Sequence, residues 1–73
     1  MRRRIPPHWI EAVLGDPEQQ VHEGDSKIVQ QSRFTDERGK MYLVRAIIAT
    51  DKEPPVVITV YRTSKVQKYW RQP

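Results

Sequence analysis

The residues best suited to chemistry gather near the C-terminal end of the chain, in the stretch YRTSKVQKYW from Tyr61 to Trp70. Arg62, Lys65 and Lys68 alternate there with aromatic side chains, and the stretch contains no acidic residue. Guanidinium and ammonium groups bind phosphate, and aromatic rings stack on unpaired bases. The pattern therefore predicts either a surface that contacts nucleic acid or a short helix whose rings pack against the domain.

Arg45 is the second candidate, because it interrupts an otherwise apolar run, MYLVRAIIA. An arginine in a buried strand costs free energy unless it is paired or faces a cleft. One interpretation is structural: an ion pair with an acid such as Glu11 or Glu23, or an arginine whose aliphatic stem packs while its guanidinium reaches water. The other is a phosphate or carboxylate ligand held on a rigid strand. The sequence leaves both interpretations open.

Arg33 stands near the end of the preceding predicted strand, so it can lie beside Arg45 if the two strands pair. With Tyr61 or Arg62 from the last strand, the two arginines would form a positively charged sheet face. Such a cluster binds RNA phosphates and stabilises the charge of a phosphoryl-transfer transition state without a metal ion. The alternative is that these are ordinary exposed strand residues.

Metal and cofactor chemistry has little support in the sequence. The chain has two histidines, His8 and His22, and no cysteine. A zinc site needs more ligands at closer spacing, and there is no glycine-rich phosphate loop. We therefore expect no metal site, no disulfide and no cofactor.

The elements that position these residues follow from periodicity and from turn residues. Paired prolines followed by apolar residues at helical spacing predict a helix over 6–14, which Gly15 would end. Beyond it the period changes to two, and polar turns separate the apolar runs. Thr63 or Ser64 would cap a last helix. The predicted strands cover 19–22, 27–34, 40–50 and 56–62, and the predicted last helix covers 65–71.

This order predicts an α+β fold with an N-terminal helix, an antiparallel meander of three or four strands, and a short C-terminal helix. We expect a single small domain over residues 1–73, because a chain of this length buries only a thin core. The third predicted strand is apolar on both faces apart from one arginine. The first helix should therefore cover one face of the sheet, and the last helix or a partner should cover part of the other.

The net charge of +4 is concentrated at the two ends of the chain. If the ends meet, they form a basic face suited to RNA, DNA or an acidic protein. The opening MRRRIPPH has no uninterrupted apolar run, which argues against a signal peptide or a membrane-spanning helix, so we expect a cytoplasmic protein without membrane contact. The basic residues at the ends are Arg2, Arg3 and Arg4, and Arg62, Lys65, Lys68 and Arg71.

Three runs, IPPHWIEAVLGDPEQ, YLVRAIIAT and PPVVITVYRTSKVQKYW, resemble short uncharacterised bacterial proteins related to RelE/ParE-type and BrnT-like ribonuclease toxins. The closing run is the most specific part of the resemblance. The resemblance implies a small α+β fold with an antiparallel sheet. The relatives carry a further segment at the N-terminus, so the resemblance implies a RelE-like fold that is shortened there. RelE-like ribonucleases use basic residues and a tyrosine near the C-terminus, which Tyr61, Arg62 and Lys65 match by type and approximate place.

Two functions follow as expectations. The first is a toxin-like RNA-binding protein or metal-independent endoribonuclease, with an antitoxin-like protein as partner, in which Arg45, Tyr61 and Arg62 act on the RNA. Tyr61 would stack on a base or transfer a proton. The alternative is a non-catalytic module that binds a protein or forms a homodimer through the same fold. The residues expected to bind the nucleic-acid backbone are Arg33, Lys65, Lys68 and Arg71.

Overall fold

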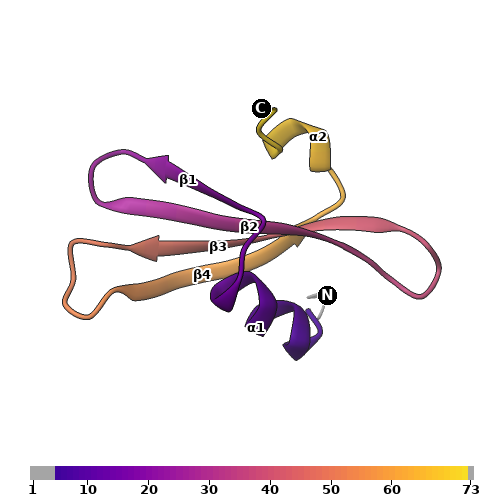
Figure 1. Cartoon of the computed structure of the whole chain (residues 1–73), viewed down its shortest axis with the longest axis horizontal. Coiled ribbons are helices and arrows are strands. Elements are labelled where there is room, and N and C mark those ends of the chain that lie inside the picture. Colours follow the sequence, from indigo (N-terminus) through magenta and orange to yellow (C-terminus); the bar gives the residue numbers. More distant parts are fainter. Residues whose placement is uncertain (1–4, 73) are drawn as a thin grey trace.

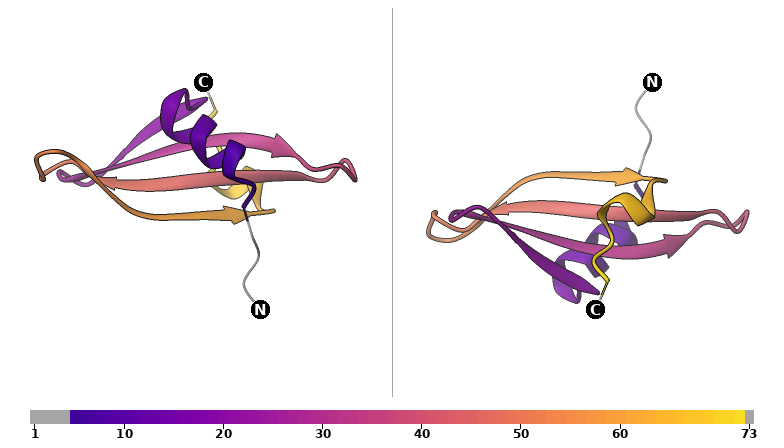
Figure 2. Two further views of the ribbon diagram at one scale, coloured as in Figure 1. Left: turned by 90° about the horizontal axis from the view of Figure 1, so that it is seen from below. Right: turned by 90° about the horizontal axis from the view of Figure 1, so that it is seen from above.

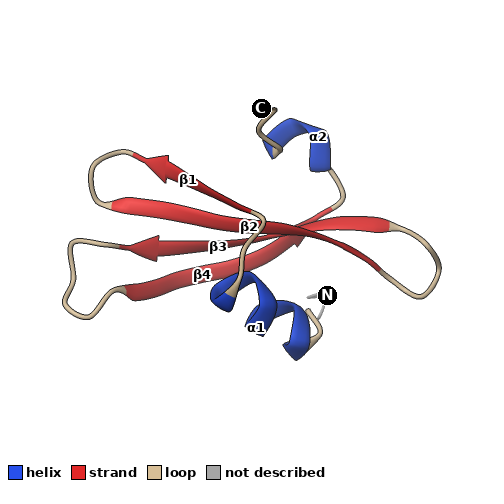
Figure 3. Ribbon diagram, in the orientation of Figure 1, coloured by secondary structure: helices blue, strands red, loops and turns tan. Residues whose placement is uncertain are grey.

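Four antiparallel strands and two helices make up the part of the chain that the computed structural model describes, residues 5–72 (Figure 1, Figure 3). The predicted α+β fold is confirmed, and each strand begins and ends within one residue of its predicted position. The helices are α1 (Pro7–Gly15) and α2 (Val66–Tyr69). The strands are β1 (Gln19–Glu23), β2 (Lys27–Thr35), β3 (Met41–Ala49) and β4 (Val56–Thr63).

The sheet is a simple meander in the order β1-β2-β3-β4, with every neighbouring pair antiparallel. Gly24 and Gly39 lie in the first two hairpin loops with φ of 71° and 84°, a left-handed conformation that glycine adopts without steric cost. Figure 2 shows α1 and α2 on opposite faces of this sheet. Because side chains alternate along a strand, each strand residue lies either on the face of the sheet that carries α1 or on the face that carries α2.

The main hydrophobic core lies between α1 and the sheet. Trp9 and Val13 of α1 are buried there with Tyr42, Val44 and Ala46 of β3. The Trp9 ring stacks on the ring of Phe34, with centroids 5.0 Å apart and planes 14° apart. This face of β3 is the one that the sequence predicts to be wholly apolar.

The C-terminal end of α1 is held by the sheet. The sequence predicts a helix over 6–14 that Gly15 ends, and the helix does end at Gly15, which is its last residue. The Asp16 N–H donates to the carbonyl of Ala12 over 2.8 Å. The side-chain amide of Gln30 donates to the carbonyls of Val13 and Leu14 over 2.9 and 3.1 Å. These bonds satisfy carbonyls that have no partner within the helix, which is how so short a helix is stabilised.

The last helix is shorter than predicted. α2 is one turn, Val66–Tyr69, where the sequence predicts a helix over 65–71, and it has no side-chain cap. The Thr63 hydroxyl instead accepts from the Lys65 N–H over 3.0 Å, which is a local turn before the helix. After Tyr69 the chain is extended and runs beside β1, where the Gln19 amide donates to the Arg71 carbonyl over 2.6 Å. Bonds to the sheet thus replace the hydrogen bonds of further helical turns.

Within residues 5–72, neither helix is long and apolar enough to cross a membrane.

Val13→Ala tests the packing of α1. The Val13 side chain is fully buried, so removing two methyl groups should lower the free energy of unfolding by about 2 kcal/mol. Glu11→Ala, at an exposed position of the same helix, should change it by less than about 0.5 kcal/mol. Urea denaturation measures both, and equal effects of the two substitutions would contradict the packing described.

Candidate functional site

The strand register decides which candidate residues lie together. Arg45 of β3 is directly opposite Gln31 of β2 and Tyr61 of β4, so all three project from the sheet face that α2 covers. Arg62 is opposite Val44, a residue of the α1 core, and therefore lies on the other face. The structure brings Arg45 and Tyr61 together and places Arg62 across the sheet from them.

Neutral groups hold the Arg45 guanidinium. The residue is 8% exposed. Its Nε donates to the Gln31 side-chain oxygen over 2.9 Å, and its Nη1 donates to the Tyr61 hydroxyl over 2.6 Å. Its Cζ lies 4.3 Å from the centroid of the Tyr69 ring, a cation–π contact. Three elements besides β3 therefore fix the position of one charged group.

The interpretation of Arg45 as half of an ion pair is wrong. Among residues 5–72, the ion pair found is that between Arg33 and Glu18. Glu11 belongs to α1, on the far face of the sheet, and Glu23 lines a pocket with Arg45 but forms no ion pair with it. The charge of Arg45 is therefore buried without a carboxylate partner in the described part of the chain.

Gln31 organises this site, and sequence reasoning missed it. Its side chain is fully buried. Its oxygen accepts from Arg45, and its amide nitrogen donates to the Gln19 side chain over 2.8 Å and to the Tyr69 carbonyl over 3.1 Å. The available signal was the polar run QQS in the middle of β2, where a buried strand would ordinarily carry apolar side chains.

Arg45 opens into a pocket of about 270 Å³ under α2 and the extended segment that follows it. Three cations and one carboxylate line this pocket, which gives it a formal charge of +2. Two aromatic residues complete its wall, so it can contact both a charged group and a flat ring. We call it the Arg45 pocket. Its lining residues are Glu23, Arg45, Lys68, Tyr69, Trp70 and Arg71.

Arg33 lies on the same face but is already paired. Its Nε lies 3.2 Å from a carboxylate oxygen of Glu18, and its Cζ lies 3.9 Å from the centroid of the Trp70 ring. The side-chain hydrogen bond from Arg33 lowers the pKa of Glu18 below its ordinary value, and partial burial of the carboxylate opposes this shift. Arg33 therefore attaches the C-terminal segment to the sheet.

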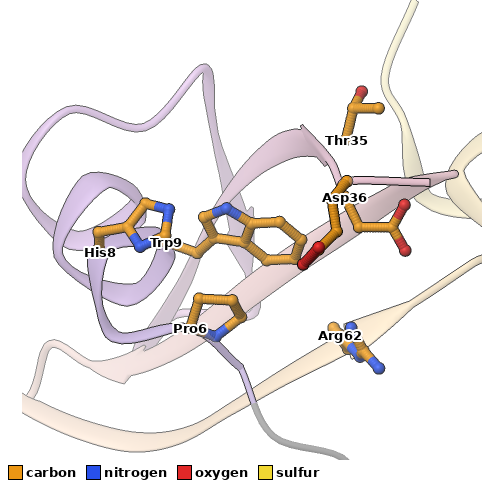
Figure 4. Close-up of a pocket in the computed structure, with 7 residues that line it drawn as sticks. Pro6, His8, Trp9, Thr35, Asp36 and Arg62 are labelled. Carbon is orange, nitrogen blue, oxygen red and sulfur yellow. The ribbon is translucent and has the colours of Figure 1, made fainter. Parts of the chain in front are cut away.

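Arg62 lines a second pocket, of about 310 Å³, between α1 and the β2–β3 loop (Figure 4). Its Cζ lies 4.3 Å from the centroid of the Tyr42 ring. Its Nε is buried and has no hydrogen-bond partner among the described residues. Asp36 and Glu37 also line this pocket, so its electrostatic character differs from that of the Arg45 pocket.

Of the remaining basic candidates, some line the Arg45 pocket and others do not. Lys68 lies in the Arg45 pocket, with its Nζ 5.3 Å from the Tyr69 ring centroid, and Arg71 lies there too. Lys65 is exposed at the start of α2 and does not line that pocket. The predicted contribution of Arg2–Arg4 to a joint basic face falls outside residues 5–72.

Comparison with models of protein families, with curated proteins and with solved structures found no match to this chain. The resemblance to RelE/ParE-type and BrnT-like toxins therefore stays a prediction.

The pKa of Glu18 tests the contact with Arg33. We expect an NMR titration to give a value below the ordinary 4.5, and Arg33→Gln to return it toward that value. A lowered pKa means that the ion pair adds stability above the ordinary pKa and that this contribution is lost as the pH falls through the lowered value. An unchanged Glu18 pKa in Arg33→Gln would contradict the contact.

Proposed function

We propose that this protein binds single-stranded RNA and that the Arg45 pocket holds a backbone phosphate. The observation that carries the proposal is the state of Arg45, a buried guanidinium held by neutral side chains without a carboxylate partner among residues 5–72. A buried charge of this kind costs free energy that a bound anion can offset. A phosphate oxygen is an acceptor that matches the guanidinium geometry.

Arg45 keeps donors for such a ligand. A guanidinium has five N–H groups, and within residues 5–72 Arg45 uses one for Gln31 and one for Tyr61, which leaves three. Because its neighbours already fix its orientation, little side-chain entropy is lost when an anion binds. The electrostatic attraction between the guanidinium and an anion is also stronger at a buried site than at a fully solvated surface, because the surroundings screen it less.

The surroundings of Arg45 favour a nucleic acid over a small anion. Lys68 and Arg71 extend the positive charge along the pocket, as successive phosphates would require. Tyr69 and Trp70 are partly exposed beside these cations and can stack on unpaired bases. The toxin-like resemblance of the sequence adds weight to RNA rather than DNA.

Binding is better supported than cleavage. The cleavage mechanism predicted from the sequence requires Arg45, Tyr61 and Arg62 around one phosphate. Arg62 lies on the opposite face of the sheet. The contact between Arg45 and the Tyr61 hydroxyl is the one observation that favours proton transfer at the site. A binding assay with labelled RNA reports cleavage as well, through the length of the recovered RNA.

Fluorescence anisotropy with a labelled single-stranded RNA tests the proposal. Three cations in the pocket predict a slope of log K against log salt of about −2, because each phosphate contact on a single strand contributes about −0.7. Lys68→Gln with Arg71→Gln should reduce the slope to about −0.7 and weaken binding by about tenfold or more in low salt.

The matched control removes two cations elsewhere, Arg38→Gln with Lys52→Gln, both in exposed loops. It has the same net charge as the pocket variant and should keep the wild-type slope. Arg45→Gln should weaken binding and Arg62→Gln should not, with circular dichroism used to show that both are folded. Equal losses in the pocket and loop variants would show that only net charge matters and would overturn the proposal.

A further inference from the structure

The two edges of the sheet differ strongly in their exposed side chains. β1 is short and polar, QQVHE, and the C-terminal segment lies against it through hydrogen bonds between Gln19 and Arg71. β4 forms the opposite edge, and its outer side pairs with no other strand in the described part of the chain (Figure 1). Both β1 and β4 are sheet edges in the described part of the chain, and β4 is the longer and more apolar of the two.

The first half of β4 is apolar and exposed. Residues 56–60 read VVITV, without a charge or a proline. Val56, Val57 and Ile58 are 49%, 43% and 51% exposed, although branched side chains of this size are usually buried. The register with β3 shifts between Ile47 and Ile48, which makes Ile58 the extra residue of a bulge. A bulge is one of the devices that protect a sheet edge, but charges and prolines, two others, are absent from 56–60, although Pro54 and Pro55 precede the strand.

We infer that β4 is a homodimer interface, in which it pairs antiparallel with β4 of a second copy. Charge supports a second copy as the occupant. Arg62 and Lys65 lie at one end of β4, and the loop before its other end carries Asp51 and Glu53 with Lys52 between them, a net charge of −1. A two-fold axis through the middle of the strand places the basic end of each copy beside the acidic loop of the other.

The centre of the strand suits the same arrangement. An antiparallel pairing centred near Ile58 brings uncharged branched residues opposite one another, with no like charges across the interface. The unpaired backbone groups of each edge would then bond to the other copy. A two-fold axis perpendicular to the sheet also keeps both Arg45 pockets on one face of the joined sheet. The dimer does not depend on RNA binding.

Sedimentation velocity over a range of protein concentrations tests this interface. The wild-type protein should form a dimer, and Ile58→Lys should weaken it by at least about tenfold, because it places two ammonium groups at the two-fold axis. Gln20→Lys adds the same charge at the exposed β1 edge and should leave the dimer intact. A wild-type protein that stays monomeric, or a dimer that Ile58→Lys does not change, would overturn the inference.

A charge exchange tests the orientation of the two strands. Glu53→Lys should weaken the dimer about fivefold, because it faces the basic end of the partner strand, and adding Lys65→Glu should restore it. Failure of this rescue would overturn the antiparallel arrangement. Arg45→Gln, which tests RNA binding, should leave the dimer unchanged, so failure of the interface and failure of RNA binding are separable.

Discussion

The burial of Arg45 in the middle of β3 is the constraint on which this face of the molecule depends. A guanidinium removed from water needs acceptors in fixed directions, and here β2 supplies Gln31 and β4 supplies Tyr61. The one-turn helix α2 adds the ring of Tyr69, which contacts the Arg45 guanidinium. The backbone carbonyl of Tyr69 in turn accepts a hydrogen bond from the Gln31 side chain. A change in any of these elements would leave a charged or polar group without its partners.

The two faces of the sheet therefore differ in the side chains at their centres. The α1 face carries the main hydrophobic cluster, with Trp9 stacked on Phe34 and Val13 fully buried. The α2 face is polar at its centre and is covered by one helical turn. The fully buried side chains of Val29 and Leu43 lie on this face beside the polar centre.

Much of this fold could be predicted from sequence because its periodicities are clear. Alternation and turn residues located the four strands, and the prolines located α1. The length of α2 could not be predicted, because Gln19 and Gln31, far away in sequence, bind the backbone where the helix would have continued. Tertiary hydrogen bonds of this kind override local propensity.

The candidate site was predictable in part. Arg45 was recognisable as a charge in an apolar strand, but its partners depend on register, which places Gln31 and Tyr61 on either side of it. Strand alternation alone separates Tyr61 from Arg62.

Side-chain ¹H–¹⁵N spectra recorded during titration with single-stranded RNA test most directly whether RNA binds in the Arg45 pocket. If RNA binds in the Arg45 pocket, the Arg45 Nε–H signal shifts while that of Arg62 does not. An Arg45 signal unchanged at saturating RNA would contradict binding there.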